Sequence, residues 1–152
     1  MTAQVDFYVL GEASDDARLR LACRLTEQAF LEGQRVLAWT DDAASAEAYD
    51  SLLWTFGDRA FVPHEPLAAD TEAPVQFTHA APLPPGTGGF DVLLNLRAAA
   101  VPAEVGVPRI IEVIDGDAAR RNAGRERFRA YRERGLKPVH HNLDNASQIG
   151  NG

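Results

Sequence analysis

The stretch Arg35-Val36-Leu37-Ala38-Trp39-Thr40 is short and nearly continuous in apolar residues, with Gly33 shortly before it and Asp41 directly after it. A run of this kind, without polar alternation, is typical of a β-strand that is buried on both faces. Such strands occur in parallel sheets that carry helices on both sides. The stretch therefore predicts a layered α/β domain.

Helical patterns stand on either side of this strand. Before it, Ser14 is a good N-cap, apolar residues then recur at roughly helical spacing, and Gly33 marks the end. After it, Asp41 or Asp42 can cap a second helix that extends to about Leu53. Helices that alternate with buried strands indicate a mostly parallel sheet.

The rest of the chain continues this pattern. Further strands are predicted over residues 6–10, 74–79, 90–96 and 109–114. Asp117 can cap a last helix, which is expected to reach about Arg134 and to stop at Gly135. The segments 54–66 and 82–89 are expected to be irregular because they are rich in Gly and Pro.

The domain organisation follows from these elements and from the length of 152 residues. We expect one Rossmann-like α/β/α domain over residues 1–137 and a flexible, polar C-terminal tail over residues 138–152. The single cysteine, Cys23, cannot form an internal disulfide, and there is no run of roughly 20 apolar residues and no leader-like N-terminus. A cytoplasmic protein without a membrane span is the expectation.

Charge is distributed unevenly along the chain. Residues 118–137 carry eight Lys/Arg and two Asp/Glu, a net charge of +6, whereas the remaining residues carry seven and twenty, a net charge of −13. A local reversal of this size suggests a binding site for an anion. The acidic remainder argues against nucleic acid wrapped over the whole surface.

Within the last helix the arginines fall on one side. At about 100° per residue, a stripe about 80° wide contains four of them, and Phe128 borders it: Arg121, Arg125, Arg129 and Arg132. Guanidinium groups beside an aromatic ring suit a ligand that has carboxylates and an apolar side chain. The alternative is a solvated basic face with Phe128 and Tyr131 in the core.

The opposite side of this helix is expected to pack on the sheet through small residues, namely Ala119, Ala123 and Ala130. A second feature is the segment from Leu53 to His64, which holds Trp54, Phe56 and Phe61 between helix-breaking residues. Exposed rings in such a segment would anchor a partner protein. Equally, the loop could fold over the sheet edge and bury them.

Motifs for chemistry are weak or absent. Residues 84–89 are glycine-rich but lack the lysine and the following helix of a phosphate loop, and the turn at residues 10–14 has one glycine where a dinucleotide site needs three. The four histidines show no metal-site spacing, and Asp115-Gly116-Asp117 is better explained as a turn before a helix. We expect no catalytic residue, no metal and no cofactor.

Several segments together resemble the chi subunit family of the bacterial DNA polymerase III holoenzyme, in order and spacing over nearly the whole chain. The Phe-Val-Pro-His string and the Arg-Glu-Arg-aromatic string are the most specific. The segments are Asp6 to Leu10, Gly33 to Leu37, Leu53 to His64, Asp91 to Leu96 and Arg125 to Arg132.

The resemblance implies a non-catalytic replisome adaptor that links single-stranded-DNA-binding protein to the clamp loader. In the family the last helix holds the acidic, Phe-ending C-terminal tail of that binding protein, which carries over to Arg125, Phe128 and Arg129. Arg132 is added by the stripe geometry, and Ile114 is the expected residue on the strand side.

The resemblance also implies a second partner, the psi subunit of the clamp loader, on a surface that maps to Trp54, Phe61 and Pro63. A helicase-like repair protein competes for a similar surface in some relatives, and DNA is contacted only indirectly. Two alternatives remain open: a module that binds single-stranded nucleic acid directly through the arginine helix, and a small nucleotide-binding α/β enzyme.

Overall fold

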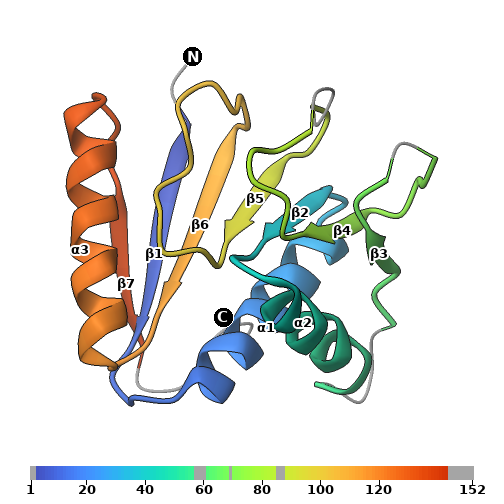
Figure 1. Cartoon of the computed structure of the whole chain (residues 1–152), viewed down its shortest axis with the longest axis horizontal. Coiled ribbons are helices and arrows are strands. Elements are labelled where there is room, and N and C mark those ends of the chain that lie inside the picture. The colour runs from blue at the N-terminus through green and yellow to red at the C-terminus, as the bar shows by residue number, and fades with distance from the viewer. Residues whose placement is uncertain (1–2, 57–60, 69, 85–87, 144–152) are drawn as a thin grey trace.

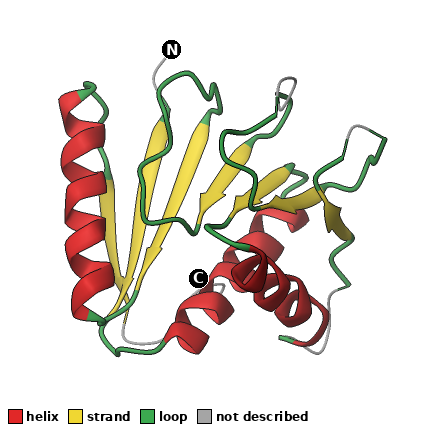
Figure 2. Cartoon of the chain, viewed as in Figure 1, coloured by secondary structure: helices red, strands yellow, loops and turns green. Residues whose placement is uncertain are grey.

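The computed structural model describes residues 3–56, 61–68, 70–84 and 88–143, and within them one sheet has helices on both faces (Figures 1 and 2). The elements, in chain order, are β1 (Gln4–Leu10), α1 (Asp15–Leu31), β2 (Val36–Trp39), α2 (Ala43–Thr55), β3 (His64–Pro66), β4 (Val75–Thr78), β5 (Val92–Asn95), β6 (Arg109–Ile114), α3 (Ala118–Glu133) and β7 (Val139–Leu143). Every strand pair in these residues is parallel, so the predicted α/β class is confirmed.

The helices begin and end at the residues that the sequence indicates. The side chains of Ser14, Asp42 and Asp117 each accept a hydrogen bond from the backbone N–H three residues further on, at 2.8–3.0 Å. Gly33 and Gly135 have φ angles of 79° and 85°, the left-handed conformation that ends a helix at low steric cost in glycine.

The strand order β3-β4-β2-β5-β6-β1-β7 places the first strand between two late ones. Alternate residues of each strand face opposite layers: Tyr8 and Leu10 pack on the side of α1 and α2, whereas Val5 and Phe7 pack on the side of α3. Figure 1 shows α3 beside β7 and β1, with α1 and α2 in the other layer. No helix in the described ranges is both long and apolar enough to cross a membrane.

The prediction of a flexible C-terminal tail over residues 138–152 is wrong for the start of that segment. Residues 139–143 form β7, which pairs in parallel with β1 from Asp6 to Leu10. The strand was missed because it is a polar edge strand: His141 stacks on Tyr8 and lies 2.9 Å from the Asp6 carboxylate, so polar residues stabilise it. Residues 144–152 lie outside the described residues.

The other edge of the sheet also differs from the prediction. His64–Pro66, expected to be irregular, forms the short strand β3 beside β4. Three residues bounded by prolines carry too little periodicity to be recognised as a strand. Within the glycine-rich loop expected at 82–89, residues 85–87 lie outside the described part of the chain.

The prediction for the inner side of α3 is wrong in detail. The buried residues of the helix are Gly124, Arg127 and Tyr131, whereas Ala119 is exposed. Arg127 and Tyr131 face the sheet because they belong to a polar network around Glu112 of β6, which is fully buried. Its carboxylate accepts hydrogen bonds from Arg127 Nε at 2.8 Å, Tyr131 Oη at 2.6 Å and Asn95 Nδ2 at 2.9 Å.

This network sets the rotation of α3 about its axis. Burial raises the pKa of Glu112, and the three hydrogen bonds together with the charge of Arg127 oppose that rise. Because Arg127 and Tyr131 must point at the sheet, the stripe of arginines predicted on the same helix points sideways toward β7.

Candidate functional site

A groove of about 720 Å³ lies between α3 and the sheet edge formed by β1 and β7. The arginine stripe forms its helical wall. The opposite wall comes from Phe7 and Val9 of β1 and from His140 and Asn142 of β7, with Ile114 of β6 also lining it. Figure 1 shows how α3 runs along this edge of the sheet.

All five residues predicted to hold a peptide tail line this one groove: Ile114, Arg125, Phe128, Arg129 and Arg132. Their role in binding stays a prediction. The sequence did not indicate the β1 and β7 residues of the opposite wall. The only usable signal for β7 was the alternation in Val139 to Leu143, which is too polar to stand out from a tail.

The floor of the groove is aromatic. The Phe128 ring lies 5.2 Å from the Phe7 ring and stacks on His140 at 4.5 Å with an interplanar angle of 22°. Gly124 allows the helix to approach β6 closely, because a Cβ at this position would overlap the side chain of Ile114. The groove therefore offers apolar surface between its cationic groups.

The cationic groups keep much of their binding capacity. Arg125 Nη1 donates to Asn122 at 3.0 Å, and Arg129 makes an exposed ion pair with Glu126 at 3.2 Å, a type of contact that contributes little. Arg132 has no side-chain hydrogen bond or ion pair within the described residues. Glu133 is the acidic residue of the lining.

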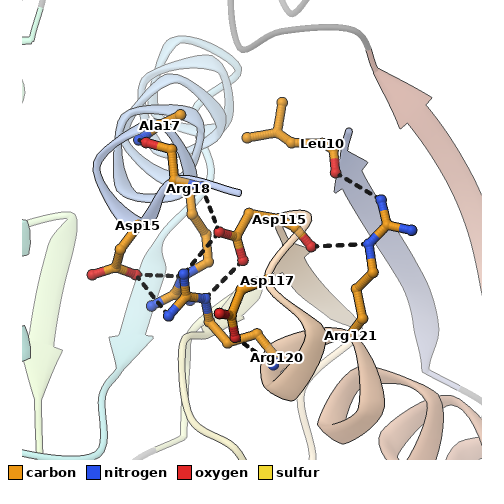
Figure 3. A network of polar contacts seen from close by, with 9 residues as sticks. Leu10, Asp15, Ala17, Arg18, Asp115, Asp117, Arg120 and Arg121 are labelled. Atoms are coloured by element: carbon orange, nitrogen blue, oxygen red, sulfur yellow. Dashed lines mark hydrogen bonds and ion pairs between the residues drawn. The ribbon is translucent and has the colours of Figure 1, made fainter. Parts of the chain in front are cut away.

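Arg121 is held at the α3 N-terminal end of the groove. Its guanidinium donates to the main-chain oxygens of Leu10 and Asp115, both at 3.4 Å (Figure 3). These bonds orient the side chain without neutralising its charge, since both acceptors are uncharged carbonyls.

Asp115 occupies the position at which a doubly wound fold would bind phosphate. Its fully buried carboxylate accepts hydrogen bonds from Arg120 (Figure 3). It also accepts one from the N–H of Ser14, the N-cap of α1. Burial alone would raise the pKa of Asp115, but Arg120 and Ser14 hold it below its ordinary value. A Cβ on Gly116 would overlap the main chain at Gly11, so the turn after β6 packs closely against the turn after β1.

The second predicted surface lies at the far edge of the sheet, by α2 and β3. Trp54 is 56% exposed and Phe61 is 65% exposed, and their ring centroids are 5.3 Å apart. Pro63 is half-buried beside them, and the buried His64 supports Trp54 at 4.6 Å. Trp54 and Phe61 are therefore not buried under the loop, whereas residues 57–60 lie outside the described residues.

A comparison with known families decides the relationship. The family model of the DNA polymerase III chi subunit, HolC, matches residues 1–139. The chain belongs to the DNA polymerase III chi subunit family. The resemblance inferred from the sequence is thereby confirmed, and it supports a role for this chi-family chain as a polymerase III subunit in DNA replication.

Two relatives of this chi-family chain cover it almost completely. It is 39% identical over 140 residues to the DNA polymerase III subunit chi of Pseudomonas aeruginosa strain PAO1, which is 92% of this chain and 96% of the relative. It is 26% identical over 135 residues to the DNA polymerase III subunit chi of Haemophilus influenzae strain Rd, which is 89% of this chain and 94% of the relative.

Proposed function

We propose that the protein is a non-catalytic adaptor that holds the acidic, Phe-ending C-terminal tail of single-stranded-DNA-binding protein in the groove beside α3. The observation that carries the proposal is the convergence of the arginine stripe and the Phe128 floor on one groove. Guanidinium groups bind carboxylates in charge-assisted, often bidentate pairs, and the aromatic floor suits a phenylalanine ring.

The size of the groove fits the last few residues of an extended peptide. Arg121 and Arg132 are eleven residues apart on α3, which corresponds to about 16 Å of helix. An extended chain spans that distance in about five residues at about 3.3 Å each. Arg125 or Arg129 then receives the terminal carboxylate, while the remaining arginines attract the upstream acidic residues.

A second contact completes the adaptor. We propose that Trp54, Phe61 and Pro63 bind the psi subunit, and that the protein thereby connects the binding protein to the clamp loader. Exposed aromatic anchors of this kind commonly supply most of the energy of an interface. A helicase-like repair protein is the alternative occupant of this surface.

The central test is titration calorimetry with an Asp-rich peptide that ends in phenylalanine carboxylate. Arg125→Ala is expected to weaken binding by about 1–3 kcal/mol, because it removes a charge-assisted contact. Arg20→Ala, an exposed helical arginine on α1 that also pairs with a neighbouring side chain, is the matched control and should bind like the parent. Equal affinities for the parent and Arg125→Ala would refute the site.

Direct binding of nucleic acid predicts a different result. A labelled single-stranded oligonucleotide would bind the protein alone, with a steep dependence on salt. The adaptor model predicts that this protein alone leaves the fluorescence anisotropy of the oligonucleotide unchanged. A change is expected only after single-stranded-DNA-binding protein is added. The net charge of −13 outside residues 118–137 opposes the direct mode.

A further inference from the structure

His140 is the residue of the groove lining, within the described chain, whose ordinary titration range lies near neutral pH. It belongs to β7, the strand that pairs with β1 at the sheet edge. The family match ends one residue earlier, at Val139, so His140 lies beyond the part of the chain that the family model covers.

The ring of His140 is held in place by two aromatic neighbours. It stacks on Phe128 at 4.5 Å, and the Phe7 ring meets it edge-on at 6.1 Å with an interplanar angle of 81°. His141 alternates to the other face of the sheet, where it contacts Asp6 and Tyr8. The two adjacent histidines therefore have separate environments, and His140 alone lines the groove.

The charged groups that line the groove with His140 come from α3. They are the four arginines of the stripe, Arg121, Arg125, Arg129 and Arg132, together with Glu133. The other elements packed around it contribute Phe7 and Val9 from β1 and Ile114 from β6, none of which titrates.

We propose, building on the proposed function, that His140 contacts the acidic peptide and takes up a proton when the peptide binds. The carboxylates of the peptide neutralise the arginines and place negative charge beside the imidazole, so the protonated ring is favoured in the complex. Peptide affinity then rises as the pH falls from about 8 to about 6. The carboxylates of the peptide stay ionised over this range because their ordinary pKa values are near 4.

Titration calorimetry at about pH 6, 7 and 8, at constant ionic strength, tests this coupling with the Asp-rich, Phe-ending peptide. The expected affinity is about three- to tenfold higher at pH 6 than at pH 8, since one proton changes affinity by at most about tenfold per pH unit. At pH 7 the heat should depend on the ionisation enthalpy of the buffer, with net proton uptake. Equal affinities and buffer-independent heats would overturn the proposal.

Two variants assign the proton to His140. His140→Gln is expected to bind no more tightly at pH 6 than at pH 8, whereas His141→Gln keeps the pH dependence of the parent. In the parent, the NMR signal of the His140 ring should move toward its protonated position when peptide is added at pH 7. Retention of the full pH dependence in His140→Gln, or a ring signal that peptide does not move, would contradict the assignment.

The two proposals fail in different ways. A peptide that binds at no pH refutes both the adaptor site and the role of His140. A peptide that binds in an Arg125-dependent manner, but equally well from pH 6 to pH 8, refutes the role of His140 alone.

Discussion

Glu112 is the residue on which the orientation of α3 depends, because Arg127 and Tyr131 reach it from the helix and Asn95 reaches it from β5. A buried ion pair contributes little net stability, but removal of one partner leaves the other charge uncompensated. The side chains that fix the helix are thus separate from those that line the groove.

The buried network predicts a large loss of stability for Glu112→Leu. The substitution leaves Arg127 buried without its carboxylate, and the free energy of unfolding is expected to fall by about 3–5 kcal/mol. Urea unfolding followed by circular dichroism measures the change. The double variant Glu112→Leu/Arg127→Met should recover much of the loss, and a single variant as stable as the parent would show that the pair is dispensable.

At the scale of secondary-structure elements, β1, β6 and β7 are joined by Asp6. Its nearly buried carboxylate accepts a hydrogen bond from Arg109 of β6 at 2.9 Å and contacts His141 of β7 at the same distance. Burial alone would raise the pKa of Asp6, but these two partners hold it below its ordinary value of 3.8. A lowered pKa means that the carboxylate stabilises the fold above that value and ceases to do so as the pH falls through the folded-state pKa.

We therefore expect Asp6→Asn to be less stable than the parent at pH 7, by about 1–3 kcal/mol, the range for a lost charge-assisted hydrogen bond. The difference should narrow as the pH falls below 3.8. Urea unfolding at about pH 7, 5 and 3 gives the comparison. Asp16→Asn, which removes an exposed carboxylate of α1, is the control. If the loss of stability in Asp6→Asn were the same at all three pH values, it would contradict the link between the Asp6 pKa and stability.

The elements also show what a local pattern can predict. The helices were predictable because caps and terminal glycines act within a few residues, as Ser14 and Gly33 illustrate. The two edge strands were not predictable, because an edge strand pairs with a single neighbouring strand and its residues can stay polar. Half of the groove was therefore predictable from α3, whereas the wall from β1 and β7 depends on pairing across more than 130 residues.

At the scale of the whole molecule, the groove and the aromatic surface lie at opposite edges of the sheet, beside β7 and β3. Sites this far apart, with no shared residues, are expected to act independently. That independence is what an adaptor needs in order to hold two partners at once.

Independence predicts that Phe61→Ala abolishes copurification with the proposed small partner subunit but leaves the affinity for the tail peptide unchanged. Phe61 is largely exposed, so the fold should tolerate the change. Arg125→Ala should show the reverse pattern. If Phe61→Ala lost both interactions and still gave a native circular dichroism spectrum, the two partners would share one surface.

The position of β1 between β6 and β7 has a consequence for biosynthesis. Asp6 can pair with Val139 only after Val139 has been synthesised and has emerged from the ribosome. Contacts so distant in the chain form late and slow the folding of a domain. Until β7 has paired with β1, the groove lacks the part of its wall that His140 and Asn142 supply, so the lining beside α3 is completed only in a late step of folding.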